Sequence, residues 1–547
     1  MDCRMINKDL LDFYNSSPMR EGVLCWYPFD KNASVLDMSN GALTELLRSR
    51  CGRVVSDIHE SRNGFDYVIV IDPVDFSTDS LKTLRERLNE HGRLLLAYEN
   101  PFALRYWNGK RSPVTGVPYD TLFGCDGRIS KAEMQIRLKL AGFEGQKWYY
   151  PLTDHWFARE IYSENYLPDE YLNQRFKPYL SDDVTLKFDE RHLYREVIRG
   201  GAFEFMCGAY LIEARANACD APCVVDYAAI TAFREPPKRF ATTVRSDGKV
   251  IKTPLHPDGI ESITRIYNNH KELAGLGLNI VPVELYNNSL VMQKIGLPTL
   301  WDYWVRKLIN GAFDFSEMSG HFDMIYEDIK KAAKTGKCYW ELVPANCFYD
   351  AGRGRITYFD QEYYWEGSPP EIAMARALWA LNYSPAFSAD PRTASWLESL
   401  KERYGLTERW DELSNLADLK TLSEVFGVGD INLEQITRSA ISHIQNYQNL
   451  NPIATKLGVL GFKRPLVYGY GVRGKRICRI LHDHGIKSAA VYDREFHIGD
   501  SLSSFSGRTD ADIVVVSIQG GEYIAMELRG ILTIPVFTVE ELLNEQP

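Results

Sequence analysis

The sequence predicts a multidomain α/β protein with three domains, which span residues 1–165, 185–445 and 463–547. Three observations predict this. A chain of 547 residues has room for roughly three to four domains of ordinary size. In the first and last segments, apolar runs of strand length alternate with amphipathic helical stretches, which is typical of parallel α/β sheets. In the middle segment strand-like runs come first and helical stretches follow, which indicates an α+β domain.

The composition excludes several classes of protein. Hydrophobic residues make up 45% of the chain and charged residues 25%, as in globular proteins that do not span membranes. A net charge of −10 argues against a dedicated nucleic-acid binder, which normally carries a basic face. The ten cysteines are scattered, and we interpret them as free thiols of a reducing compartment. The N-terminus lacks the pattern of a signal peptide, and no apolar run approaches the ~20 residues of a membrane span. We therefore expect a cytoplasmic protein.

In the first segment, acids follow the first two predicted strands. Asp37 ends the run SVLDM, Gly41 follows in the turn before a helical stretch, and Asp57 ends the second run. This arrangement resembles class I methyltransferases, where the turn lets the backbone approach S-adenosylmethionine and the second acid binds a ribose diol. The resemblance implies that these three residues bind the cofactor. Ordinary strand-end acids would produce the same pattern, so that alternative stays open.

The same segment is predicted to be shorter than a full methyltransferase domain. Only Gly41 remains of the glycine-rich turn, and about ten residues separate Asp57 from the next strand-like run, FDYVIVID. The later run LLLAYEN, followed by ALRYWNG, is similar to a bacterial methyltransferase subgroup. Glu99 and Asn100 end that strand, which predicts that they lie near the mouth of a ligand site, and we count Glu99 among the cofactor-binding candidates.

Residues 346–363, NCFYDAGRGRITYFDQEY, suggest a metal site. Two strand-like arms flank a GRG tip, with Asn346 at one end and Asp360 at the other. Amide and carboxylate oxygens are ligands that Mg²⁺ accepts, so both residues are candidates to hold Mg²⁺ for a nucleotide. The alternative is that Asn and Asp stand there because both favour turns.

The order of segments resembles the bifunctional methyltransferase–kinase proteins of bacterial surface-polysaccharide (O-antigen) biosynthesis. Their second domain has the protein-kinase-like fold of aminoglycoside phosphotransferases. In that resemblance Lys252, in VIK, would hold the nucleotide phosphates, and Glu272 would orient the lysine, with Glu261 in reserve. Asn346 and Asp360 would be the Mg²⁺ ligands of the family's ATP site.

The middle segment also departs from the family. Glu341 stands where the catalytic Asp is expected, and Tyr339 or Trp340 stands where a His is expected. A glutamate is one methylene longer, yet its oxygen could still accept a hydroxyl proton, so Glu341 is the candidate base. Gln361 replaces the Gly that often follows the metal-binding Asp. No GxGxxG phosphate loop lies between the first two strands, so basic side chains could contact phosphates instead: Arg234, Lys238 or Arg239.

In the last segment a glycine pattern follows a strand and opens a helix. Gly469, Gly471 and Gly474 form GxGxxG, and Asp493 ends the next strand-like run. This context predicts a small Rossmann-like module in which the helix N-terminus faces a phosphate and the acid binds a ribose. Its ligand could be NAD(P) or a nucleotide-sugar. No YxxxK pair follows, which argues against a dehydrogenase.

The sequence therefore predicts a transferase-like protein that acts on a sugar or glycan hydroxyl with ATP and Mg²⁺. Lys252, Glu272 and Glu341 are the candidate catalytic residues, and glycan-assembly proteins are the expected partners. An S-adenosylmethionine-dependent methyltransferase is the alternative enzyme. A non-catalytic scaffold with nucleotide-binding domains is the alternative from another class.

Overall fold

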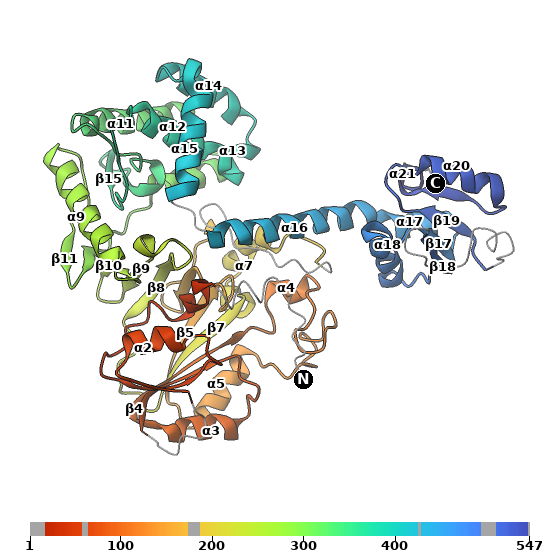
Figure 1. Cartoon of the computed structure of the whole chain (residues 1–547), viewed down its shortest axis with the longest axis horizontal. Coiled ribbons are helices and arrows are strands. Elements are labelled where there is room, and N and C mark those ends of the chain that lie inside the picture. Colours follow the sequence, from red (N-terminus) through yellow and green to blue (C-terminus); the bar gives the residue numbers. More distant parts are fainter. Residues whose placement is uncertain (1–16, 57–63, 173–185, 425–427, 494–509, 545–547) are drawn as a thin grey trace. The chain divides into compact units, whose positions relative to one another are not determined.

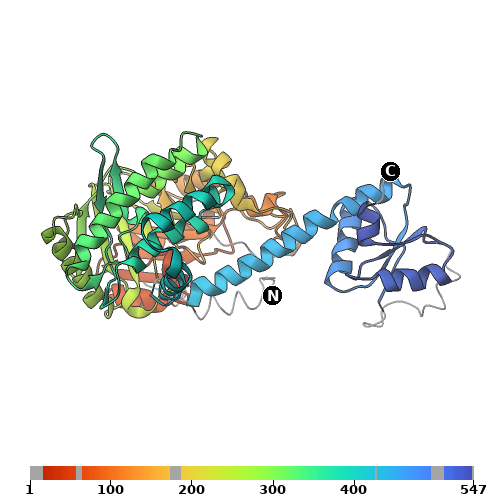
Figure 2. The ribbon, with the colours of Figure 1, turned by 90° about the horizontal axis from the view of Figure 1, so that it is seen from above.

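The computed structural model describes residues 17–56, 64–172, 186–424, 428–493 and 510–544. The chain forms two compact units (Figure 1). Unit 1 comprises Met1–Leu180 and Glu190–Ile436, and unit 2 comprises Ser181–Asp189 and Thr437–Pro547. The boundary falls within α16 (Val428–Leu450), a single long helix that both views show in light blue (Figures 1 and 2). In the described part of the chain, no helix combines the length and hydropathy that crossing a membrane requires.

One end of the large sheet of unit 1 is parallel. Its strands are β1 (Ser34–Met38), β2 (Arg53–Val55), β3 (Phe65–Ile71) and β4 (Leu88–Glu99), in the order β4-β3-β1-β2. Successive residues of β3 enter different hydrophobic clusters, since Val68 and Val70 face one and Ile69 and Ile71 the other. Helices that cover this region include α2 (Thr44–Arg50), α3 (Thr78–Arg87) and α5 (Lys131–Leu140). The predicted parallel α/β region is therefore confirmed. Its strands are buried on both faces, which explains the continuous apolar runs in the sequence.

The same sheet continues, antiparallel, into the middle of the chain. β7 (Ala209–Arg215) pairs with β4 and with β5 (Gly145–Leu152), and β6 (Glu160–Ser163) joins β5 to β8 (Val225–Ile230). Beyond β8 come four further strands in the order β9-β10-β12-β11: β9 (Phe240–Arg245), β10 (Lys249–Pro254), β12 (Ser289–Gln293) and β11 (Glu284–Tyr286). The two regions predicted as separate domains thus share one twelve-stranded sheet.

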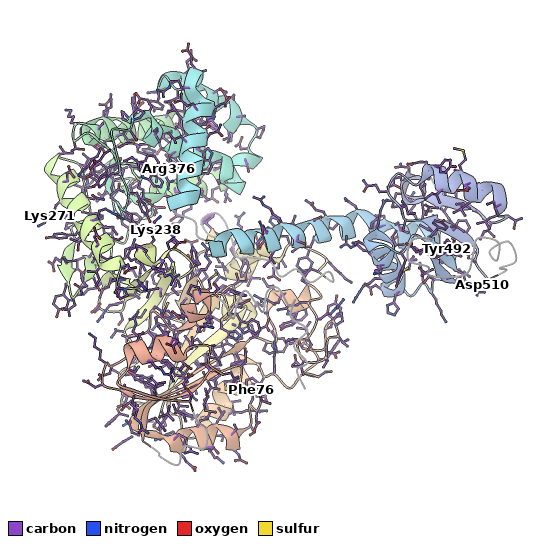
Figure 3. The ribbon with its side chains drawn as sticks, in the orientation of Figure 1. Phe76, Lys238, Lys271, Arg376, Tyr492 and Asp510 are labelled. Atoms are coloured by element: carbon purple, nitrogen blue, oxygen red, sulfur yellow. The ribbon has the colours of Figure 1, made fainter. Side chains whose placement is uncertain are left out.

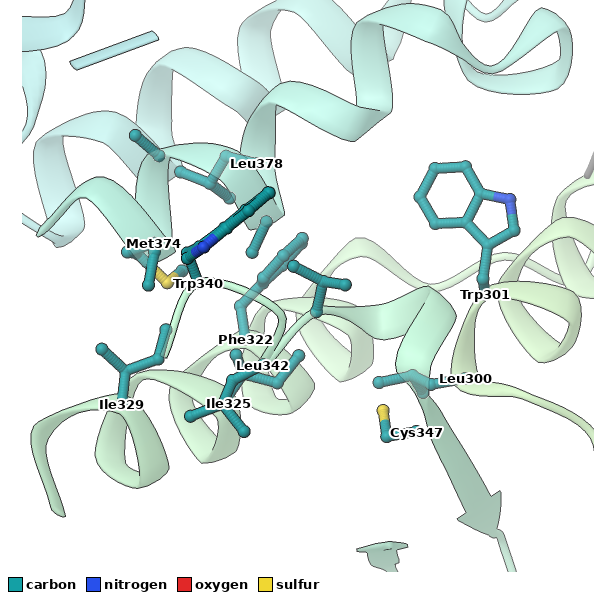
Figure 4. Close-up of a cluster of buried hydrophobic side chains, with 14 of the residues drawn as sticks. Leu300, Trp301, Phe322, Ile325, Ile329, Trp340, Leu342, Cys347, Met374 and Leu378 are labelled. Carbon is teal, nitrogen blue, oxygen red and sulfur yellow. The ribbon is translucent and has the colours of Figure 1, made fainter. Parts of the chain in front are cut away.

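Helices build the rest of the middle region, residues 225–424. α9 (Gly259–Gly275) follows β10, and further along the chain come α10 (Leu300–Ile309), α11 (Phe315–Ala333), α12 (Glu371–Tyr383), α13 (Pro385–Ala389), α14 (Arg392–Arg403) and α15 (Trp410–Glu424). A hairpin of β14 (Cys347–Asp350) and β15 (Arg355–Tyr358) lies between α11 and α12 in the sequence. The largest hydrophobic cluster packs these elements together, with Phe322, Trp340 and Met374 in its interior (Figure 4).

Unit 2 holds a four-stranded parallel sheet. Its order is β18-β17-β19-β20, with bounds Ala490–Tyr492, Pro465–Tyr468, Ile513–Val516 and Val536–Thr538. The helices α17 (Pro452–Val459), α18 (Val472–Asp483), α20 (Glu522–Ile531) and α21 (Val539–Asn544) accompany it. Hydrophobic clusters lie on both faces of the sheet, as in its larger counterpart.

Candidate functional site

The β14–β15 hairpin brings Asn346 and Asp360 to its open end. Cys347 pairs with Tyr358, so the residues just outside the ladder face each other, and the Phe359 N–H donates to the Asn346 carbonyl over 2.9 Å. The side-chain amide of Asn346 makes no hydrogen bond with another described residue. Asp360 has a φ of 55°, a left-handed conformation that is rare outside glycine and is found at sites that constrain the backbone. The hairpin therefore places Asn346 opposite Phe359, one residue before Asp360.

Lys252 reaches the same place from β10. Its ammonium is buried and donates to the Asp360 carboxylate over 2.6 Å, and it makes a second, shorter contact with Glu362 Oε1. Burial alone would raise the pKa of Asp360, but the charge of Lys252 and its hydrogen bond outweigh burial and lower it. Two carboxylates thus share one ammonium, while 38% of the Asp360 side chain remains exposed to solvent.

Glu341 lies on the loop before the hairpin and is buried. One of its carboxylate oxygens accepts a hydrogen bond of 2.8 Å from the Glu362 N–H, and the other lies 4.0 Å from the guanidinium of Arg376. Burial raises the pKa of Glu341 to about 7, although Arg376 opposes the shift. A carboxylate with a pKa near the working pH is suited to take a proton from a hydroxyl.

Two neighbours fix the position of Glu341. Trp340 is embedded in the helical core beside Met374 and Leu378 (Figure 4), and Arg376 of α12 stacks over its ring at 3.9 Å. The buried Gln361 amide donates to the Glu341 carbonyl over 3.0 Å and to the Phe359 carbonyl over 2.9 Å. The replacement of glycine by Gln361 therefore ties the segment that carries Asp360 to the loop that carries Glu341.

The expected pairing of Glu272 with Lys252 is wrong. Glu272 accepts hydrogen bonds from Lys337 over 2.5 Å and from the Tyr339 hydroxyl over 2.7 Å, so it has other partners. The reserve candidate, Glu261, is exposed. The carboxylate that meets the lysine is Glu362, which the sequence reasoning missed. The sequence feature that could have identified Glu362 is its place two residues after the predicted metal ligand Asp360, in DQE.

Cations approach the site from the connection between β8 and β9. Arg234 lies 3.8 Å from the Glu362 carboxylate, and Lys238 lies over the Tyr363 ring at 5.9 Å. Arg239 instead donates to the Arg234 carbonyl, so it supports the connection. Figure 3 labels Lys238 and Arg376 on the ribbon. Among the basic residues considered as phosphate contacts, Arg234 meets a carboxylate of the site.

The donor set suits a hard cation. In the described residues no cluster of three or more His, Cys, Asp and Glu side chains could hold a metal. The grouping here is instead two carboxylates and one amide, Asp360, Glu362 and Asn346. Mg²⁺ is bound through one or two carboxylates, keeps several waters and takes further ligands from phosphates, so this sparse oxygen set fits it.

In the parallel region the candidate acids have local partners. Asp37 accepts hydrogen bonds from the Ser39 N–H over 2.9 Å and from the Thr44 hydroxyl over 2.5 Å, so both of its oxygens shape the turn before α2. Gly41 in that turn has a φ of 85° and open space where a side chain would lie. Asp57 lies outside the described residues. The turn is thus open, but its acid is already hydrogen-bonded.

Glu99 belongs to a cluster of charges at the end of β4. Lys110 lies 3.1 Å from its carboxylate, Arg128 2.9 Å and Arg105 3.6 Å. Burial would raise its pKa, but these three cations outweigh burial and hold the pKa well below its usual range. The neighbouring Asn100 is buried and hydrogen-bonds to backbone carbonyls. Ion pairs therefore explain the buried Glu99, and hydrogen bonds to the backbone explain the buried Asn100.

The glycine loop of unit 2 has the close approaches that its pattern predicts. A Cβ on Gly474 would lie 1.8 Å from the Gly469 carbonyl oxygen, so only glycine fits there, and Gly469 itself has a φ of 94°. Gly471 caps α18, and the space beside it is open. Asp493, which would bind a ribose, accepts a hydrogen bond from the Tyr470 N–H of the loop. The loop is therefore closely packed on one side and open on the other.

Comparison with known proteins adds little. No protein-family model matches the chain, and no curated protein matches it. Among solved structures, a SAM-dependent methyltransferase from Archaeoglobus fulgidus matches with 15% identity over 38% of this chain and all of that one, at a TM-score of 0.24. WaaP in complex with acyl carrier protein matches with 11% identity over 33% of this chain and 83% of that one, at a TM-score of 0.25. Similarity at this level decides neither fold nor function.

Proposed function

We propose that the middle region binds ATP with Mg²⁺ and transfers a phosphoryl group to a sugar or glycan hydroxyl. One observation carries the proposal: Lys252, from a strand of the sheet, meets Asp360 at 2.6 Å beside the hairpin end that also holds Asn346. Phosphoryl transfer needs a lysine for the phosphates, oxygen ligands for the metal and a group that accepts the proton of the hydroxyl. Glu341 is the third of these groups.

Each residue of the site has a separate role in the proposed transfer. Mg²⁺, when bound with ATP, would neutralise charge on the phosphates, and Asp360, Asn346 and Glu362 are the residues that would hold it. Lys252 would turn its ammonium toward the phosphates. Glu341 would accept the proton of the acceptor hydroxyl on a carboxylate oxygen, for which its raised pKa suits it.

Arginine side chains support the same chemistry. Arg234 at the β8–β9 connection and Arg376 on α12 both approach the acids of the site, at 3.8 Å and 4.0 Å from Glu362 and Glu341. Guanidinium groups recognise phosphate oxygens through paired hydrogen bonds. Arg234 would thus do for the phosphates what backbone amides do in a glycine-rich loop.

The acceptor class rests on the sequence resemblance to surface-polysaccharide proteins. A binding partner in glycan assembly follows from the same resemblance.

We propose a second ligand for unit 2 because of the close packing at Gly474. The contact between Gly474 and Gly469 brings the start of α18 close to β17, which is the role of the third glycine in dinucleotide-binding loops. A nucleotide-bearing ligand, NAD(P) or a nucleotide-sugar, would place its phosphates at the open side of Gly471. A Gly474→Ala variant should lose any thermal stabilisation by such a ligand.

The proposed function is tested by nucleotide binding to the full-length protein. We expect calorimetry to detect ATP binding that strengthens when Mg²⁺ replaces EDTA. Asp360→Ala should abolish the Mg²⁺-dependent part, whereas Glu272→Gln, on the helix beside the site, should keep it. Release of ADP with a glycan acceptor would then establish transfer. Equal binding by the wild type and Asp360→Ala would contradict the proposal.

Ligand-binding measurements on the full-length protein also test the methyltransferase alternative. S-adenosylmethionine that stabilises the wild type, but not an Asp57→Ala variant, would favour the parallel region as the active one. If neither S-adenosylmethionine nor ATP with Mg²⁺ binds, the scaffold alternative is left.

A further inference from the structure

Helix α9 offers no carboxylate to Lys252, yet it touches the segment that carries the acids of the site. Among its buried residues are two polar ones, Asn269 and His270, each 2% exposed. A buried polar side chain is costly unless it is hydrogen-bonded, so their partners show what they stabilise.

Both partners are backbone atoms of one residue, Gln361. The Asn269 amide donates to the Gln361 carbonyl over 2.9 Å. The Gln361 N–H donates to His270 Nε2 over 3.4 Å. Gln361 stands between Asp360 and Glu362, so the two contacts hold the peptide groups on either side of it.

The histidine is itself oriented. Its Nδ1 lies 3.2 Å from the Val281 carbonyl, and because Nε2 accepts a hydrogen bond, Nδ1 carries the proton and donates. Val281 in turn donates its N–H to the Tyr358 carbonyl over 2.8 Å, and Tyr358 donates to the Asn279 carbonyl over 2.9 Å. Residues 279–281 therefore secure the end of β15, and α9 secures the residues just beyond it.

The hydrogen bonds from α9 to Gln361 lie next to a residue with a strained backbone, Asp360. Asp360 holds a left-handed conformation, which is unfavourable for a residue with a side chain and persists only where neighbours enforce it. The contacts to Gln361 lie directly after that residue, and the next residue, Glu362, meets Lys252 and the Arg234 guanidinium.

We infer that Asn269 and His270 are positioning residues that fix Asp360 and Glu362 against Lys252, in place of a helix carboxylate bound to the lysine. The lysine is then oriented by acids of the same segment that would hold the metal. The inference rests on the proposed function for its metal, and on the hydrogen bonds alone for its geometry.

A matched pair of variants separates positioning from packing. His270→Gln keeps a polar atom near the position of Nε2, whereas His270→Asn reaches only as far as Nδ1, and both place a neutral amide in the core. Hydrogen exchange of the backbone over residues 359–363 should stay slow in the wild type and His270→Gln and become faster in His270→Asn. Glu272→Gln, two residues along α9, is the control and should not change it.

Ligand binding gives the second measurement. His270→Asn should weaken ATP binding in Mg²⁺ by about five- to tenfold, the worth of one buried hydrogen bond, and leave binding in EDTA unchanged. His270→Gln should restore it.

Three outcomes are decisive. Slow exchange in His270→Asn would overturn the contact itself. Faster exchange with undiminished Mg²⁺-dependent binding would overturn its positioning role. A wild type that shows the exchange pattern but binds no ATP with Mg²⁺ would overturn the proposed function, and with it the role of these residues in holding a metal site.

Discussion

The parallel end of the large sheet and the separate β14–β15 hairpin both place acids at strand ends, but these acids have different surroundings. In the parallel region Asp37 is 3% exposed and the Glu99 side chain 13%, and nearby groups already hydrogen-bond or neutralise them. In the middle region the Asp360 side chain is 38% exposed and shares a lysine from a distant strand. An acid at a strand end therefore marks a site only when several elements converge on it and leave it accessible to solvent.

The largest effect is expected at Asp360. Asp360→Ala should weaken ATP binding in Mg²⁺ by on the order of a hundredfold or more, because it removes a metal ligand and leaves Lys252 with one carboxylate. Calorimetry in Mg²⁺ and in EDTA measures this. If Asp37→Ala had the same effect on ATP binding, the contrast between the parallel region and the hairpin would fail.

The next effect concerns Glu341 and the rate of transfer. Glu341→Gln should lower kcat by about a hundredfold while ATP affinity stays unchanged, since a general base acts on the chemical step. Because the pKa of Glu341 is raised to about 7 and the base must be ionised, the wild-type rate should rise with pH up to about that value and then level off. A flat pH–rate profile between pH 5 and 9 would exclude Glu341 as the base.

In the parallel region the effect should appear in stability instead. Glu99→Gln leaves three cations without their shared carboxylate and should lower the free energy of unfolding by about 3 kcal/mol, with no change in ATP binding. The pKa of Glu99 is depressed in the folded state, so its stabilisation is complete at neutral pH and is lost as pH falls through that value. Urea titrations from pH 7 down to about pH 2 should therefore show the difference between variant and wild type shrinking as the carboxylate becomes protonated in the folded protein.

The smallest effect is expected at Asp37. Asp37→Ala removes two hydrogen bonds of the turn before α2 and should cost about 1–2 kcal/mol of stability. Thermal unfolding without ligand measures it. A loss of S-adenosylmethionine binding in this variant, without loss of stability, would instead assign Asp37 to a cofactor site.

Local patterns predicted the elements well and the partners less well. Buried strands such as β3 were evident from continuous apolar residues, and the hairpin from two strand-like arms around GRG. The placement of Asn346 opposite Phe359, one residue before Asp360, also followed, because strands joined by a short turn must bring their far ends together.

Contacts between distant segments could not be predicted in the same way. Glu272 has a spacing that suits a lysine partner, but the side on which it leaves α9 directs it to Lys337 and Tyr339. Glu362 was overlooked because only three-dimensional pairing shows that it meets Lys252. The joining of β6 to β8 depends likewise on long-range pairing, which no local period encodes.

A crystal structure of the full chain with Mg²⁺ and a non-hydrolysable ATP analogue would test the proposed metal–nucleotide site at the level of single atoms. We expect a cation at about 2.1 Å from an Asp360 oxygen, with the Asn346 amide oxygen in its coordination sphere and Lys252 turned to the phosphates. A nucleotide bound elsewhere, or a metal held without Asp360, would contradict it.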